Sequence, residues 1–129
     1  MDSLFTEENN ILKISPGKTI EDVGRFFISI EYTLVFFESE KCKTKEDLLI
    51  EFKEKLKFPD DFGFNWDALE DSLRNLVYEG SSKKYLLGFK DSVVLTEDME
   101  GKEILKDILK TASAFLKEKH NIDLKSIFF

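Results

Sequence analysis

The stretch FPDDFGFNWDALEDSL, residues 58–73, carries five acidic side chains and no basic one. Basic residues crowd its flanks instead: Lys53, Lys55, Lys57, Arg74, Lys83 and Lys84. Pro59 ends any helix that precedes it, and Asn65 is a favourable N-cap for a helix that starts at Trp66. The apolar residues of that helix recur at helical spacing; they are Trp66, Leu69, Leu73, Leu76 and Val77. The stretch therefore predicts a loop over residues 58–64 and a helix from Trp66 to about Tyr78.

Three residues of this stretch have expected structural roles. Gly63 is free to adopt a positive φ in the loop, and its small size also lets a partner approach closely. Phe62 is expected to anchor the loop by packing inward. Trp66 begins the apolar stripe, so we expect it in the core or at its edge.

The sequence on either side alternates between strand-like and helix-like patterns. Strands are expected over residues 11–14, 33–37, 85–89 and 122–129, and the apolar run TLVFF at 33–37 is typical of a strand covered on both faces. Thr19 and Thr44 are expected to cap helices, the second ending near Lys57, and the longest helix spans about 100–119. Gly24 and β-branched residues leave a strand as the alternative after Thr19. The alternation predicts an α/β fold: a small, mostly parallel β-sheet with helices packed on it.

Composition restricts the class of function. The 129 residues suit one domain, and 19 basic against 26 acidic residues give a net charge of −7, which argues against a nucleic-acid partner. The chain has one cysteine and one histidine, so it can form neither an internal disulfide nor a common Cys/His zinc site. Its start lacks a secretory pattern, and no run approaches the roughly 18 apolar residues of a membrane span. We therefore expect a cytoplasmic protein with no metal, no cofactor and no membrane partner.

The five carboxylates gather at one end of the predicted helix. Asp67, Glu70 and Asp71 stand at i, i+3 and i+4 and so share one face, while Asp60 and Asp61 lie in the loop just before. One interpretation is a solvated acidic helix end, because carboxylates are favourable near a helix N-terminus. The other is a concentrated anionic surface that imitates phosphates and binds a basic site. Charge alone leaves both interpretations open.

The run KFPDDFGFNWDALEDSLRNL, residues 57–76, resembles the signature of the barstar family, the intracellular inhibitors of the ribonuclease barnase and related enzymes. The matching positions are Pro59, Phe62, Gly63, Asn65, Trp66, Asp67, Ala68, Leu69, Asp71 and Leu73. The order of the predicted elements also fits the family over residues 32–129. Residues 1–31 resemble the added strand and helix of longer members, so the resemblance implies one barstar-like domain over residues 1–129.

What the resemblance implies is a binding mechanism without catalysis. The loop and the following helix plug a ribonuclease active site, where Asp71 takes the place of a substrate phosphate and Asp67 makes further charged contacts. The candidate partner-binding residues are Asp60, Asp61, Gly63, Asp67, Glu70 and Asp71. Asp61 and Glu70 stand where the family has aromatic residues, so the expected target is a basic ribonuclease other than barnase.

Three functions compete on this basis. The first is a ribonuclease inhibitor, an immunity protein that is a monomer when free. The alternative is an acidic protein-binding adaptor on the same fold with a non-nuclease basic partner, because fold does not fix function. An enzyme ranks last, since Asp67 and Asp71 lie on one exposed helix face rather than across a cleft, and a single histidine offers no catalytic triad.

Overall fold

A computed structural model describes residues 3–37, 39–76 and 83–129 of the chain. Its elements, in chain order, are β1 (Phe5–Glu8), β2 (Ile11–Ile14), α1 (Ile20–Ser29), β3 (Thr33–Phe36), the short 3₁₀ helix η1 (Ser39–Lys41), α2 (Lys45–Leu56), α3 (Trp66–Arg74), β4 (Lys84–Phe89), α4 (Met99–His120) and β5 (Asp123–Phe128). The strands form one sheet in the order β1-β2-β5-β4-β3. Only the β1–β2 pair is antiparallel among these strands, which confirms the predicted mostly parallel α/β fold.

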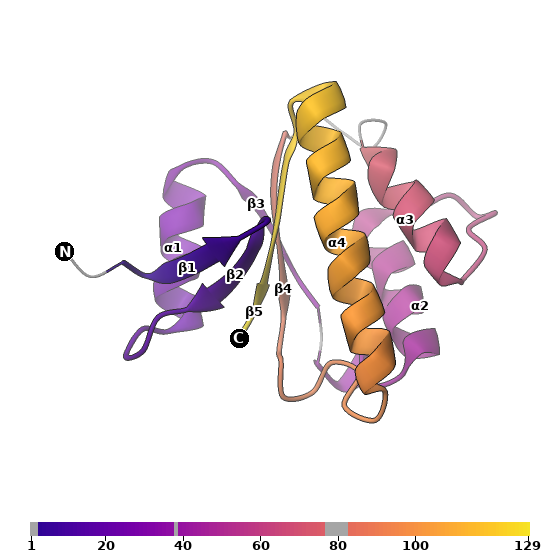
Figure 1. Cartoon of the computed structure of the whole chain (residues 1–129), viewed down its shortest axis with the longest axis horizontal. Coiled ribbons are helices and arrows are strands. Elements are labelled where there is room, and N and C mark those ends of the chain that lie inside the picture. The colour runs from indigo at the N-terminus through magenta and orange to yellow at the C-terminus, as the bar shows by residue number, and fades with distance from the viewer. Residues whose placement is uncertain (1–2, 38, 77–82) are drawn as a thin grey trace.

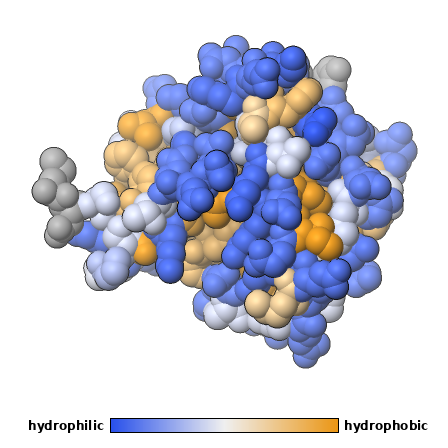
Figure 2. Space-filling view, in the orientation of Figure 1, coloured by the Kyte–Doolittle hydropathy of each residue, from blue (hydrophilic) through white to orange (hydrophobic). Residues whose placement is uncertain are grey.

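The sheet separates two unequal layers of helices. Helix α1 lies on one face, and α2, α3 and α4 lie on the other (Figure 1). Strand β4 shows the division in its side chains: Leu87 and Phe89 point into the large core with α2, α3 and α4, whereas Leu86 joins the small core under α1. On the face drawn in Figure 2, hydrophilic residues predominate, and hydrophobic residues emerge in separate patches between them. Among the described residues, no helix is long and apolar enough to cross a membrane.

Side-chain caps explain where the helices begin. The Thr19 hydroxyl accepts a hydrogen bond from the Asp22 amide at 3.1 Å, and the Asp22 carboxylate accepts one from the Thr19 amide at 3.3 Å. This reciprocal capping box fixes the start of α1 and places Val23 and Phe27 in the core. The strand alternative for this segment is therefore wrong. Thr44 caps α2 with a single hydrogen bond, which its hydroxyl accepts from the Asp47 amide at 3.1 Å.

Strand β3 departs from the prediction made for TLVFF. It lies at the edge of the sheet, Thr33 is exposed, and Phe36 keeps 37% of its surface exposed. The apolar run therefore does not mark a strand buried on both faces. Phe36 instead spreads over the sheet surface at Gly88, where an added Cβ would lie 2.3 Å from the Phe36 ring. An apolar run of this kind indicates that its side chains make apolar contacts. It does not indicate whether the strand has a neighbour on both sides or lies at the sheet edge.

Strand β1 was not predicted, and it forms a hairpin with β2. Asn9 and Asn10 make the two-residue turn with φ of 53° and 66°, and Glu8 pairs with Ile11 across it. Two consecutive positive φ values define the type I′ turn that suits a tight hairpin, and asparagine tolerates this conformation better than most residues. The Asn-Asn pair was thus the available signal for this turn. The polar sequence FTEE carried too little apolar alternation to suggest a strand.

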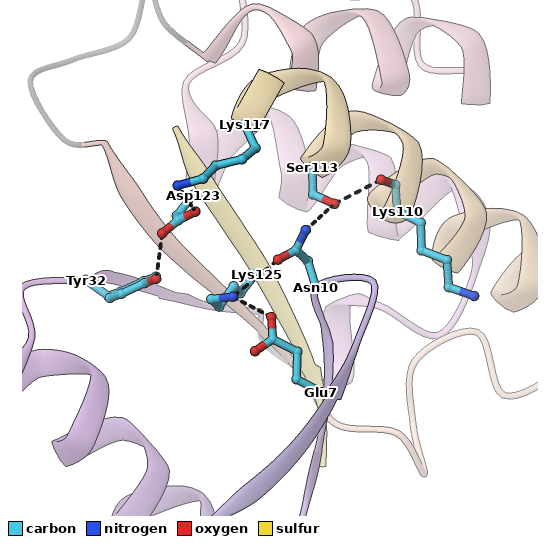
Figure 3. A network of polar contacts seen from close by, with 8 residues as sticks. All are labelled: Glu7, Asn10, Tyr32, Lys110, Ser113, Lys117, Asp123 and Lys125. Carbon is cyan, nitrogen blue, oxygen red and sulfur yellow. Dashed lines mark hydrogen bonds and ion pairs between the residues drawn. The ribbon is translucent and has the colours of Figure 1, made fainter. Parts of the chain in front are cut away.

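The hairpin is held to the rest of the fold through the Asn10 side chain (Figure 3). Its amide nitrogen donates to the Ser113 hydroxyl of α4 at 3.3 Å, and its oxygen accepts from the Lys125 ammonium of β5 at 3.2 Å. Lys125 also pairs with Glu7 of β1. These contacts add to the parallel pairing of β2 with β5 and fasten the first strands to the last one.

A second polar group joins the start of β5 to α4 and to the residue before β3. The Tyr32 hydroxyl donates to the Asp123 carboxylate at 3.0 Å, and Lys117 pairs with the same carboxylate at 3.1 Å (Figure 3). Burial, reinforced by the hydrogen bond to Asp123, raises the pKa of Tyr32 above its ordinary value. Burial disfavours ionisation of Asp123, but hydrogen bonds from Lys117 and Tyr32 and the charges of Lys117 and Lys125 outweigh it and lower the pKa of Asp123.

Candidate functional site

The loop over residues 58–64 is anchored from below by aromatic rings. Helix α2 ends at Leu56, its C-cap Lys57 has a left-handed φ of 56°, and the Phe58 amide then donates to the Lys53 carbonyl. Phe58 and Phe62 are each 6% exposed, and their ring centroids lie 5.1 Å apart. The Phe62 amide closes a turn by donating to the Pro59 carbonyl at 3.0 Å. The expected inward packing of Phe62 is confirmed, and it fixes the loop to the core.

Helix α3 begins at the predicted cap. The Asn65 side-chain oxygen accepts a hydrogen bond from the Ala68 amide at 2.7 Å, and the first helical residue, Trp66, packs at the core edge as expected. The prediction of a positive φ at Gly63 is wrong, because Phe64 adopts it instead, at 50°. Gly63 serves the cap by its size: an added Cβ would lie 3.3 Å from the Asn65 amide nitrogen and 3.5 Å from the Ala68 Cβ.

A groove of about 440 Å³ separates this loop from the outer side of α3. Two carboxylates line it, Asp61 from the loop and Asp71 from the second turn of the helix, and Gly63 lies in the same lining. The complete lining consists of Phe58, Pro59, Asp61, Phe62, Gly63, Ala68, Asp71, Ser72 and Asn75. Asn75 supports the helix wall, because its side-chain amide donates to the Asp71 carbonyl at 2.9 Å.

The other three candidate residues do not line the groove. Asp60 is fully exposed and lies 3.7 Å from the Lys53 ammonium. Glu70 pairs with Arg74 one turn later at 3.4 Å. Asp67 is exposed in the first turn of α3, where the helix dipole favours it. Two of the five carboxylates are thus compensated by bases from outside the acidic stretch, Lys53 and Arg74.

Arg74 gives the Glu70 pair a structural character. Its guanidinium lies 4.8 Å from the centre of the Phe115 ring on α4, so it bridges the two helices. Its Nε is buried and has no hydrogen-bond partner among the described residues. Glu70 therefore stabilises a contact between α3 and α4 as well as carrying charge at the surface.

Three carboxylates remain without an ion-pair partner within the described part of the chain: Asp61, Asp67 and Asp71. Asp67 and Asp71 are separated by one helical turn, where like charges repel by a few tenths of a kcal/mol. Such a surface gains by meeting cations. His120 ends α4, where its ring lies 5.9 Å from that of Phe115, and Cys42 is buried in the core and takes no part in this surface. Nor does any group of three His, Cys, Asp or Glu residues in the described ranges suit a metal ion.

The three phenylalanines of the loop look alike in the sequence but differ in burial. Phe58 and Phe62 are anchors, whereas Phe64 is 45% exposed beside the groove. Ser72 and Asn75 also line the groove and were not singled out from the sequence. The helical spacing of Asp71, Ser72 and Asn75 was the available signal, because residues one turn apart share a helix face. The predicted end of the helix near Tyr78 lies outside the described residues, and the helix ends at Arg74.

Comparison with known families identifies a match for most of the chain. The family model described as "Barstar (barnase inhibitor)" matches residues 32–126, which is more than half of the chain. The matched segment runs from the residue before β3 into β5 and includes the loop, α3 and the groove. No curated protein matches the chain.

Proposed function

The chain belongs to the barstar family, and on this basis we propose that it inhibits a basic ribonuclease by covering the active site of the enzyme with loop 58–64 and helix α3. The family consists of inhibitors rather than enzymes, and its members act on a protein partner. The observation that carries the proposal is the pair of carboxylates in the groove, Asp61 and Asp71, which have no ion-pair partner among the described residues.

In the proposed mechanism, the carboxylates occupy positions that substrate phosphates would take. Asp71 faces the main cationic groups of the enzyme, because it lies on a rigid helix and borders the groove. Asp61 contributes from the opposite wall, and Asp67 meets a cation near the N-terminus of α3. A desolvated carboxylate that is hydrogen-bonded to several cations stabilises a complex far more than a solvent-exposed pair does.

The remaining candidates take peripheral positions in this proposal. Gly63 lets the enzyme backbone approach the floor of the groove closely. Asp60 and Glu70 form the charged rim, where each already has a basic partner in the free protein. We further propose that residues 1–31 complete a single domain over residues 1–129, since β2 pairs with β5. An inhibitor of this kind would act in the cytoplasm as an immunity protein, against a nuclease of its own cell or of a neighbour.

The test is a titration of ribonuclease activity against a panel of small basic ribonucleases, at low and at physiological salt. The expected result is stoichiometric inhibition of at least one enzyme, with binding that weakens as salt rises, because screening shortens the reach of surface charges. The matched control is a double variant with Asp61→Asn and Asp71→Asn, since it keeps the shape of the groove and removes its charge.

Each alternative outcome has a defined meaning. Inhibition that persists in the double variant would contradict the phosphate-mimic mechanism. Absence of inhibition across the panel, together with capture of a basic protein that has no nuclease activity, would favour an adaptor on the same fold. The exchange of aromatic residues for Asp61 and Glu70 is the sequence feature that motivates this second candidate.

A further inference from the structure

Phe64 is an exposed aromatic residue next to the acidic groove. It keeps 45% of its surface exposed, whereas the two other phenylalanines of the same loop, Phe58 and Phe62, are each 6% exposed. Phe64 follows Gly63, which lines the groove, and precedes the cap of α3, Asn65. The ring belongs to neither of the two hydrophobic cores of the described residues, and nearly half of its surface is open to contact with another molecule.

The ring is nevertheless held in place. It packs against Phe62 with centroids 5.0 Å apart and planes at 65°, the edge-to-face arrangement that aromatic pairs favour. Phe62 in turn rests on Phe58 in the core. The Phe64 backbone has a φ of 50°, which is unfavourable for a bulky residue. The ring is therefore a rigid projection, with little conformational freedom to lose on binding.

The charges around Phe64 indicate what covers it. The Lys53 ammonium lies 5.9 Å from the centre of the ring, and the same ammonium pairs with Asp60 at 3.7 Å. One cation thus already stands over the ring and takes up part of the surface that a cation of the partner would use. The exposed remainder of the ring accordingly suits an apolar contact better than an arginine or lysine.

We propose that Phe64 is an aromatic anchor of the partner-binding surface and that the partner presents an apolar patch directly beside its basic site. This inference rests on the proposed function, because it places the anchor at the rim of the same groove. It adds a requirement on the target. The target must carry positive charge opposite Asp61 and Asp71, and beside that charge an apolar depression that receives Phe64.

The experiment measures the dissociation constant and its salt dependence for the ribonuclease identified by inhibition, using the full chain. The variants are Phe64→Ala, Phe64→Trp and Asp71→Asn, and Ile28→Ala on α1 is the control, because Ile28 is 63% exposed on the opposite face of the sheet. Phe64→Ala is expected to weaken binding at least tenfold, as truncation of an interface anchor does. It should leave the slope of binding against salt unchanged, whereas Asp71→Asn should reduce that slope.

Phe64→Trp should restore most of the affinity, and Ile28→Ala should bind as the wild type does. Thermal unfolding of each variant shows whether it is folded. Wild-type binding by Phe64→Ala, while Asp71→Asn binds weakly, would overturn the anchor and leave the proposed function intact. A loss in Phe64→Ala that is accompanied by a reduced salt slope would overturn the apolar contact and indicate a cation over the ring. Wild-type affinity in both Phe64→Ala and Asp71→Asn would refute the anchor and the proposed site together.

Discussion

Replacing Asp71 with alanine removes one carboxylate from the groove and almost nothing from the fold. Asp71 is exposed, and its carboxylate has no ion-pair partner among the described residues. The hydrogen bond from Asn75 goes to the Asp71 backbone carbonyl, which alanine retains. The substitution also relieves the repulsion from Asp67 one turn earlier, which is about 0.3 kcal/mol. We therefore expect the free energy of unfolding to stay the same or to rise slightly.

In the complex, the same substitution should be costly. Truncating one member of a hydrogen-bonded charge pair that is buried at an interface costs about 2–5 kcal/mol, a range drawn in part from the barnase–barstar pair of this same family. At about 1.4 kcal/mol for each factor of ten, the dissociation constant should rise between about 30-fold and about 4,000-fold. Most of this change should appear in the dissociation rate, because the enzyme is left with unpaired buried cations.

Two variants with the same change in charge separate local from general electrostatics. Asp60→Ala removes a fully exposed carboxylate from the loop over residues 58–64, and Asp107→Ala removes one from the exposed face of α4. Both should change the dissociation constant by a few-fold at most, because exposed pairs contribute little. Stopped-flow association and dissociation at several salt concentrations measure all three. If Asp60→Ala and Asp107→Ala both weaken binding as much as Asp71→Ala does, net charge determines affinity and the proposed role of Asp71 as the main contact is wrong.

Two further predictions concern the support of the site and of the sheet. Asn65→Ala should lower the free energy of unfolding by about 0.5–2 kcal/mol, because α3 loses its cap. Asn65→Asp keeps a capping oxygen and should not lower it. Equal stability of Asn65→Ala and the wild type in urea denaturation would contradict the capping role. Tyr32 has a raised pKa in the folded state, so its contribution is complete below its unfolded pKa of about 10 and is lost as pH rises through the folded value. The unfolding free energy of the wild type should therefore fall more steeply above pH 10 than that of Tyr32→Phe, and parallel profiles would disprove this.

Local sequence rules predicted where the helices begin, but they did not predict features that depend on contacts between segments far apart in the chain. Thr19, Thr44 and Asn65 cap helices because a side chain bonds to an amide three residues away, and such contacts can be read from the sequence. The position of β3 at the sheet edge depends on the order of all five strands, which the apolar run TLVFF does not contain. The β1–β2 hairpin was missed because its strand is polar, although Asn10 at its turn is locked to Ser113 on α4.

The candidate site divides in the same way. Helical spacing predicts that Asp67, Glu70 and Asp71 share one face. The Glu70–Arg74 pair spans one helical turn, so it could also have been predicted from the sequence. The pairing of Asp60 with Lys53 could not be read from the sequence, because it depends on how the chain turns after α2. The positive φ of Phe64 rather than Gly63 likewise could not be read from the sequence, because glycine is the residue that adopts it most easily.

The shape of the groove and its charge are set by different residues. Phe58 and Phe62 fix the loop wall by burying their rings, and the Asn65 cap fixes the start of the helix wall. Asp61 and Asp71 project from these walls and support neither of them, because both are exposed and unpaired within the described residues. If the proposed function holds, substitution of Asp61 or Asp71 would change the charge that a partner meets without moving the walls, whereas truncation of Phe62 or Asn65 would remove a contact that fixes a wall.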